Sequence, residues 1–289
     1  MTPEEFHAQR QFVETSFGKI AYIRLGKGPT ALFIHGVPLN GYHWRNQLEA
    51  LSDVRDCIAI DLMGLGHSEV AADQDLTFPT QAKMVLEVLD ALNIETVDLV
   101  ANDSGGAVAQ LTAVAAPDRI RSMVLTNCDV HDNWPPATFA QAVALAQAGE
   151  FQKILEEALT NHSLAQSDFG LGISFEDANH ITPELVKTYL EPLMQNDDRR
   201  AQLNRYVALM NCEQTVPIEP QLKQLSVPTL IIWGTGDVFF GVEWAHWLKG
   251  TIPGATKVIE LDGARLFFCE ERSEIVNDHI RNHWAALAT

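Results

Sequence analysis

A strand, a tight turn and a helix are predicted in the segment Val97-Asp98-Leu99-Val100-Ala101-Asn102-Asp103-Ser104-Gly105-Gly106-Ala107. Its first residues form an apolar, β-branched run typical of a buried strand, and the small residues that follow favour a sharp turn. A side chain held at such a turn projects from the carboxyl edge of a sheet, where the next backbone amide can stabilise an oxyanion. The segment therefore predicts a nucleophile turn between a strand and a helix.

Two registers of this turn compete, because Asp103 and Ser104 are each followed by a glycine two residues later. With Asp103 at the apex, the positions two residues before and after are Ala101 and Gly105, and both are small enough for a strained turn. With Ser104 at the apex, one of these positions becomes Asn102, whose side chain is bulkier. The spacing therefore favours Asp103 as the nucleophile.

Apolar runs rich in β-branched residues predict the central strands. They lie at Thr30–Ile34, Cys57–Ile60, Val97–Ala101, Ser122–Thr126, Thr229–Trp233 and Lys257–Leu261. Helical patterns such as Thr80–Leu92 and Gly106–Ala116 alternate with these runs, which indicates an α/β fold with a mostly parallel, doubly wound sheet. An antiparallel hairpin at about Gln11–Leu25 is expected to open the sheet.

The alternation of strands and helices stops after residue 128 and returns at residue 227. The pair Pro135-Pro136 begins a run of helix-like segments between these points. A separate helical domain would give the same pattern, but the strands on both sides must rejoin one sheet. We therefore expect a core of residues 1–128 and 227–289, with residues 129–226 inserted as a helical cap.

Further motifs lie at the expected ends of strands and helices. They are His35-Gly36-Val37-Pro38, Trp44-Arg45, Asp61-Leu62-Met63-Gly64-Leu65-Gly66-His67-Ser68 and Pro117-Asp118-Arg119. Together with the turn at Asp103, they resemble the α/β-hydrolase superfamily in its haloalkane dehalogenase and epoxide hydrolase branch. The resemblance covers nearly the whole core and implies the α/β-hydrolase fold. It also implies that Asp103 is an aspartate nucleophile and that the amides of Val37 and Ser104 form the oxyanion hole.

The catalytic triad that the resemblance implies is incomplete. Gly234-Thr235-Gly236-Asp237 is similar to the family's acid loop, so Asp237 is the expected triad acid; the alternative is a carboxylate that only satisfies turn amides. The family's histidine follows the last strand in a pattern like Gly-Ala-Gly-His-Phe. This chain reads Gly263-Ala264-Arg265-Leu266-Phe267, so Leu266 occupies the expected histidine position.

An aspartate nucleophile can form an alkyl-enzyme ester unaided, but hydrolysis of that ester requires a base that activates water. Three explanations remain open: another residue is the base, the reaction needs no ester hydrolysis, or Leu266 is a substitution. The candidates for a substitute base or for pocket residues are Asp129, His131, Trp134, Tyr189 and Tyr206. Each also has an ordinary structural interpretation, in hydrogen bonding within the cap or in helix packing.

Three functions fit these features. The first is hydrolysis of a small, mostly apolar molecule, with Asp103 as nucleophile and a non-standard or missing histidine base. The second is a lyase or isomerase reaction: Asp103 and Asp237 would face each other across Leu266, and burial and like charge would raise a carboxylate pKa. The third is a catalytically inactive ligand-binding homologue. A haloalkane dehalogenase proper fits poorly, because that branch has Trp and Asn where this chain has Ser104 and Val37.

The composition of the chain limits the partners and the cellular compartment that we expect for the protein. The 289 residues carry a net charge of −18 at pH 7, which would repel a nucleic-acid backbone. The four cysteines are scattered without disulfide or metal-ligand spacing, and neither an apolar signal core nor a membrane-length run occurs. We therefore expect a cytoplasmic protein with a small-molecule substrate and without a cofactor, a metal, a membrane or a nucleic-acid partner. Formation of a homo-oligomer stays open.

Overall fold

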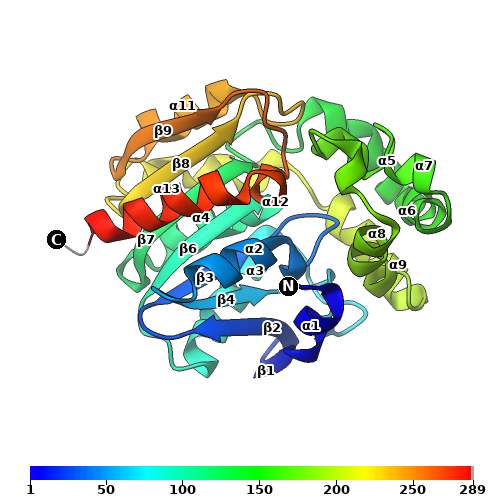
Figure 1. The fold of residues 1–289 in the computed structure, drawn as a ribbon, viewed down its shortest axis with the longest axis horizontal. Helices are drawn as coiled ribbons and strands as arrows, with labels where there is room; N and C mark the ends of the chain where they lie inside the picture. Colours follow the sequence, from blue (N-terminus) through cyan, green and yellow to red (C-terminus); the bar gives the residue numbers. More distant parts are fainter. Residues whose placement is uncertain (288–289) are drawn as a thin grey trace.

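The computed structural model describes residues 1–287 and contains one nine-stranded sheet flanked by helices (Figure 1). The strands are β1 (Gln11–Thr15), β2 (Gly18–Gly26), β3 (Thr30–Ile34), β4 (Asp56–Ile60), β5 (Glu69–Val70), β6 (Val97–Asp103), β7 (Ile120–Cys128), β8 (Thr229–Gly234) and β9 (Ala255–Leu261). The helices are α1 (Pro3–Ala8), α2 (Arg45–Leu51), α3 (Phe78–Ala91), α4 (Ser104–Ala115), α5 (Ala140–Gln147), α6 (Phe151–Thr160), α7 (His162–Ala165), α8 (Pro183–Leu190), α9 (Asp197–Ala208), α10 (Glu219–Leu222), α11 (Val242–Thr251), α12 (Phe268–Glu271) and α13 (Ser273–Ala286).

The strands follow the order β1-β2-β4-β3-β6-β7-β8-β9, and β5 pairs with β2. The pairs β1–β2 and β2–β4 are antiparallel, whereas every pair from β4 to β9 is parallel. The predicted mostly parallel, doubly wound sheet is therefore confirmed. β4 is added to the sheet on one side of β3, and β6 and the later strands are added on the other side. Ligands in open α/β sheets bind at such a reversal of strand order, which here lies between the carboxyl ends of β3 and β6.

The central strands form the middle of the hydrophobic core. β3, β4 and β6 are buried at every residue, as their mostly apolar sequences predict. α2 packs with α13, and α3 packs with α4, while α11 covers β8 and β9. Burial from both faces makes these strands a rigid support for the loops at their carboxyl ends.

Two short elements are not predicted from the sequence pattern, namely α1 and β5. β5 has only two residues, too few for a periodic pattern to be recognised. α1 is a single short helix stabilised by a capping box, in which the Glu5 amide donates to the Thr2 hydroxyl and the Thr2 amide donates to the Glu5 carboxylate. Both elements lie at the edge of the fold and leave the predicted order of the core strands unchanged.

The segment between β7 and β8 is a helical insertion, as predicted. Its helices and turns run from Ala137 to Leu222, and residues 137–222, all of which the structure describes, contain no strand. Figure 1 shows α5 to α9 gathered at one end of the sheet. Within this group α5 packs on α9, and α6 packs on α8. The insertion is therefore a cap over one end of the core.

A buried carboxylate, Glu270 of α12, joins the core to the cap. It accepts hydrogen bonds from Arg45 Nη1 at 2.8 Å and from the Tyr189 hydroxyl at 2.6 Å, and His43 Nδ1 lies 3.1 Å away. Burial raises the pKa of Glu270, but the charge of Arg45 and the hydrogen bonds of His180 and His43 outweigh it and hold the pKa well below the usual range. Because Tyr189 belongs to α8, this network ties the cap to the loop after β3.

We expect Glu270→Gln to lower the free energy of unfolding by about 3–5 kcal/mol, because it leaves the Arg45 charge buried without a partner. Urea unfolding at neutral pH measures the change. The matched control is Asp53→Asn, which breaks the exposed Arg281–Asp53 pair and should leave the urea midpoint almost unchanged. A Glu270→Gln midpoint equal to that of the control would contradict a structural role for the network.

Candidate active site

The turn between β6 and α4 holds Asp103 in a strained conformation, with φ 54° and ψ −136°. A non-glycine residue rarely adopts a positive φ, and such strain is found mainly at functional sites. The turn also requires glycine on its far side: a Cβ at Gly105 would lie 2.4 Å from the His35 carbonyl oxygen, and one at Gly106 would lie 2.2 Å from Cys128 Cβ. The small residues after Asp103 therefore let α4 start directly against β3 and β7.

The side chain of Ser104 points away from the position that a nucleophile would occupy. Its Oγ lies 3.0 Å from the hydroxyl of Tyr206, a residue of the cap helix α9. Both hydroxyls are buried. Of the two residues at the turn, only Asp103 lines the cavity that extends toward the cap. The geometry thus matches the register in which Asp103 stands at the apex.

The loop after β3 lies directly against the Asp103 carboxylate. A Cβ at Gly36 would come within 2.1 Å of Asp103 Oδ2, so the loop can approach this closely only with glycine. Burial lowers the pKa of His35 to about 4, so its ring is neutral. In this form Nδ1 donates to the Gly36 carbonyl at 2.8 Å and Nε2 accepts from the Leu62 amide at 3.1 Å. His35 therefore positions the loop and has no proton to give at neutral pH.

Two opposing effects set the ionisation of Asp103, which is 6% exposed. Burial raises its pKa, and the nearby charge of Asp237 adds to the rise. The backbone N–H groups of Ser104 and Val37 favour the charged form and oppose this rise. The result is a pKa of about 7. Oδ2 is buried and has no hydrogen-bond partner within the protein.

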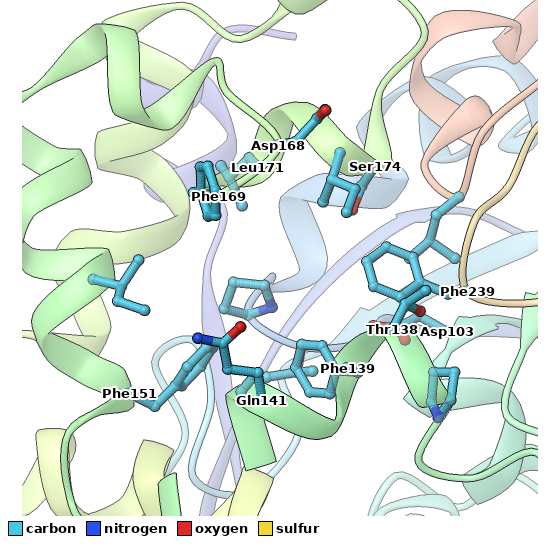
Figure 2. Close-up of a pocket in the computed structure, with 18 of the residues that line it drawn as sticks. Asp103, Thr138, Phe139, Gln141, Phe151, Asp168, Phe169, Leu171, Ser174 and Phe239 are labelled. Carbon is cyan, nitrogen blue, oxygen red and sulfur yellow. The ribbon is translucent and has the colours of Figure 1, made fainter. Parts of the chain in front are cut away.

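A cavity of about 200 Å³ extends from Asp103 into the cap. Figure 2 shows Phe139, Phe151, Phe169 and Leu171 around this space, with Asp103 at one side of it. Most of the lining is apolar, and its polar side chains are Asp103, Asp129, Thr138, Gln141, Asp168 and Ser174. None of the lining residues is a histidine. A small apolar molecule in this cavity would therefore meet the buried Asp103 carboxylate among mostly apolar side chains.

Leu266 lines the same cavity and is 4% exposed. The side chain of Asn102 fixes its backbone: Nδ2 donates to the Leu266 carbonyl at 3.1 Å, and also to Thr126 Oγ1 and to the Asn127 carbonyl. The loop after β9 is thus held against the end of the nucleophile strand. The loop therefore lies beside Asp103, where the histidine was expected. Only the residue type at position 266 differs from that expectation.

Asp237, the expected triad acid, is half-buried behind this loop and does not line the cavity. Its Oδ2 accepts from Asn127 Nδ2 at 2.7 Å, and its Oδ1 accepts from the Phe239 amide at 2.9 Å. Burial raises its pKa to about 6, and these donors limit the rise. Asp237 therefore acts on Asp103 through its charge, from a position outside the cavity lining.

Asp129 is the predicted substitute residue that does line the cavity. It follows β7 directly, is 2% exposed, and its Oδ1 has no hydrogen-bond partner. Its amide donates to the Asp103 carbonyl at 3.4 Å. Burial raises its pKa well above the usual range, and the charges of Asp103 and Asp237 add to this effect. Asp129 is therefore a buried carboxyl group beside Asp103, and its surroundings favour its protonated form.

His131 and Trp134 are not among the residues that line the cavity, contrary to the expectation for a base or pocket role. His131 Nε2 lies 3.0 Å from the Glu219 carboxylate, and its ring packs on Trp247 with a centroid distance of 4.8 Å. The Trp134 ring packs on Phe78 at 4.1 Å. A left-handed φ of 48° at His131 turns the chain here, so both side chains belong to the packing between core and cap.

Tyr189 and Tyr206 also lie outside the cavity lining. The Tyr189 hydroxyl is committed to Glu270, and the Tyr206 hydroxyl to Ser104 Oγ. Burial raises the pKa of both hydroxyls. Neither hydroxyl is free to give a proton to a molecule bound at Asp103, because each is fully buried in a hydrogen bond to the protein.

The sequence does not predict that Asn102 holds the Leu266 backbone and that Asn127 binds Asp237. Both are amides at the carboxyl ends of neighbouring parallel strands, and such ends meet at one edge of the sheet. That placement is the signal that would have identified them. The apolar lining from the cap carries no such signal, because a phenylalanine or leucine on a cap helix reads as ordinary packing.

The family is shown by a comparison with known proteins, since residues 29–271 match the alpha/beta hydrolase fold. The chain belongs to this family. It is 26% identical over 280 residues to haloalkane dehalogenase 2 of Mycobacterium bovis, covering 93% of this chain and 92% of that protein. It is 24% identical over 278 residues to epoxide hydrolase 4 of Mus musculus, covering 90% and 73%. It is 26% identical over 298 residues to a cis-3-alkyl-4-alkyloxetan-2-one decarboxylase of Shewanella oneidensis, covering 97% and 90%.

This member of the alpha/beta hydrolase fold family shows no preformed metal site: among residues 1–287, no three or more His, Cys, Asp or Glu side chains are grouped to hold an ion. The four cysteines are all free. In the same part of the chain, no helix has both the length and the hydropathy needed to cross a bilayer.

We expect Asp103→Asn to stabilise the protein at pH 8 by about 2–4 kcal/mol and to have almost no effect at pH 4. The folded chain binds the Asp103 proton more tightly than the unfolded chain, because its pKa of about 7 lies above the usual value of 3.8. This carboxylate therefore costs stability as the pH rises through 7, and asparagine removes that cost. Thermal unfolding at both pH values measures the effect. The exposed substitution Asp73→Asn is the control, and an equal effect of Asp103→Asn at both pH values would refute the argument.

Proposed function

We propose that the protein is a hydrolase that acts on a small, mostly apolar electrophile through a covalent ester on Asp103. The observation that carries the proposal is the placement of one carboxylate. Asp103 stands at a strained turn, lines an apolar cavity, and is adjacent to the amides of Ser104 and Val37. A strained, buried carboxylate lowers stability, so its presence favours a role in chemistry.

The proposed reaction has two stages. The Asp103 carboxylate attacks a saturated carbon of the substrate and displaces the leaving group, which gives an alkyl ester. Water then attacks the carbonyl carbon of that ester. The oxyanion formed there is stabilised by the N–H groups of Val37 and Ser104, and its collapse releases the alcohol and restores Asp103.

The cavity supports a small substrate with little polarity. Its volume of about 200 Å³ is below the roughly 300–1,000 Å³ that is common for ligand pockets. The similarity to a haloalkane dehalogenase and an epoxide hydrolase supports electrophiles that an aspartate can open by substitution. Ser104 and Val37 stand where the resemblance to the dehalogenase branch calls for Trp and Asn, so haloalkanes are the less favoured class.

A second candidate is a lyase or isomerase reaction in which Asp103 moves a proton and forms no ester. Its pKa of about 7 suits proton transfer near neutral pH. The similarity to a protein named as a decarboxylase also supports a reaction without hydrolysis. The fate of water during turnover distinguishes the two candidates.

We expect turnover of 1,2-epoxyhexane in water enriched in oxygen-18 to place the label in the Asp103 carboxylate. Water attacks the carbonyl carbon of the Asp103 ester in this mechanism, so the oxygen of that water stays in the Asp103 carboxylate. Mass spectrometry of the peptide that contains Asp103 detects the label. Asp103→Asn, the control, should give neither label nor product. Product formed without label in the wild type would favour the acid–base reaction, and binding without product would identify a ligand-binding protein.

The rate of the first stage should rise with pH and level off above about pH 7. Only the ionised carboxylate is a nucleophile, and the pKa of Asp103 is about 7. At pH 5 about 1% of the carboxyl groups are ionised, so the rate should fall roughly 100-fold. Loss of 1,2-epoxyhexane in a single turnover, with enzyme in excess, measures this step. A rate independent of pH between 5 and 8 would show that ionisation of Asp103 does not control it.

A further inference from the structure

We propose that Asp129 is the acid–base catalyst of this site and performs the proton transfers for which Leu266 offers no group. The inference rests on the proposed function, because it presupposes the ester on Asp103. Asp129 and Asp103 line the same cavity, and Asp129 is 2% exposed. Its Oδ1 has no hydrogen-bond partner within the protein. A free carboxyl oxygen therefore lies in the chamber where the ester forms.

The backbone fixes Asp129 relative to the nucleophile. Asp103 pairs with Cys128 across β6 and β7, and the next amide, that of Asp129, donates to the Asp103 carbonyl at 3.4 Å. On its other side, the Asp129 carbonyl accepts from Gln110 Nε2 at 2.9 Å. Only the carboxyl group is left without such restraints. This arrangement is expected of a residue that must stay in place while its side chain exchanges protons.

A purely structural role explains Asp129 poorly. An unsatisfied buried polar atom costs about 1–3 kcal/mol, and the structural carboxylate Glu270 shows how this chain avoids that cost with a full set of donors. The cavity lining contains one further carboxyl, Asp168, but that residue is exposed. Asp129 is therefore the buried titratable group that accompanies Asp103 in the described lining.

The two carboxyl groups are electrostatically suited to alternate charges. The charge of Asp103 raises the pKa of Asp129, so an ionised Asp103 favours the protonated form of Asp129. When Asp103 becomes an ester, its charge disappears and the repulsion on Asp129 ends. Asp129 can then hold the negative charge that remains after it has given its proton away. Retaining glycosidases divide the same two roles between a pair of carboxyl groups.

The proton balance of a cyclic ether can be followed atom by atom. Asp103 attacks a ring carbon, the C–O bond breaks, and the released oxygen takes the Asp129 proton. Asp129 then takes a proton from water, whose hydroxide attacks the carbonyl carbon of the ester. As the intermediate collapses, Asp129 returns this proton to the departing alkoxide, and the proton of the regenerated Asp103 carboxyl passes to Asp129. The sum is one water added to one ring, with both carboxyl groups restored.

This role defines the substrate class. A proton donor at the leaving group helps a substrate whose bond breaks to an oxygen, because an alkoxide is a poor leaving group until it is protonated. A halide needs no proton to leave. The site therefore fits small, apolar, strained cyclic ethers, of which epoxides are the simplest class.

The decisive variant is Asp129→Asn, which keeps the size of the side chain and removes its exchangeable acid. With 1,2-epoxyhexane we expect hydrolysis of the Asp103 ester to slow by about 10²- to 10⁴-fold, so that the ester accumulates and is seen by intact-mass spectrometry. Asp73→Asn, the same substitution at an exposed carboxylate outside the cavity lining, is the matched control and should turn over like the wild type. Adding Leu266→His to Asp129→Asn should restore hydrolysis, which would show that a base, and not the fold, was lost.

The leaving group provides an independent measurement. Asp129→Asn should slow the alkylation of Asp103 by 1,2-epoxyhexane far more than the alkylation by 1-bromohexane, because bromide leaves without a proton. An equal loss with both reagents would show that Asp129 only positions the site and would overturn the acid role.

The failures of the two proposals are distinguishable. Asp129→Asn that turns over at the wild-type rate, with oxygen-18 still entering Asp103, would overturn the inference about Asp129 and leave the proposed hydrolase intact. Product without any label in Asp103 of the wild type would refute the ester mechanism itself, and the role of Asp129 in it would fall with it.

Discussion

Burial of the Asp103 carboxylate at a left-handed turn is the constraint on which the site depends. The turn is possible only because Gly105 and Gly106 let α4 begin against β3 and β7, and because Gly36 lets the next loop pass within contact of the carboxylate. These close approaches bring the N–H groups of Val37 and Ser104 to the nucleophile. The same packing that strains Asp103 thus also places backbone donors against its carboxylate.

Leu266 changes the electrostatics of this arrangement more than its geometry. The loop after β9 remains attached to the nucleophile strand through Asn102, so an apolar side chain fills space beside Asp103. An imidazolium there would offset negative charge. Without one, the charge of Asp237 raises the pKa of Asp103, and the charges of Asp103 and Asp237 both raise the pKa of Asp129. Protonation of a carboxyl group relieves this repulsion, which an imidazolium would otherwise offset.

The sequence predicts the core closely because its signals are local or strongly periodic. The strands around residues 97–103 and 229–234 appear as mostly apolar runs, and the turn at Asp103 is defined by side-chain size alone. The site is predicted only in part. Asp129 lines the cavity and His131, two residues later, does not, because the chain turns at the positive φ of His131. The residue type of His131 does not predict that turn. The partners of Asp237 depend on which strands are neighbours, which the pattern of one strand cannot show.

The chain treats its buried carboxylates in two opposite ways, and the contrast bears on function. Glu270 is surrounded by Arg45, His43 and the Tyr189 hydroxyl, and these partners keep its pKa well below the usual range, as expected of a group that stabilises the fold. Asp129 is equally buried, yet its Oδ1 has no donor and its pKa moves in the other direction. A fold that can satisfy one buried carboxylate so completely has the means to satisfy another. Leaving Asp129 unsatisfied beside Asp103 therefore has a cost in stability that packing does not explain, and a carboxyl that exchanges protons with a bound molecule does.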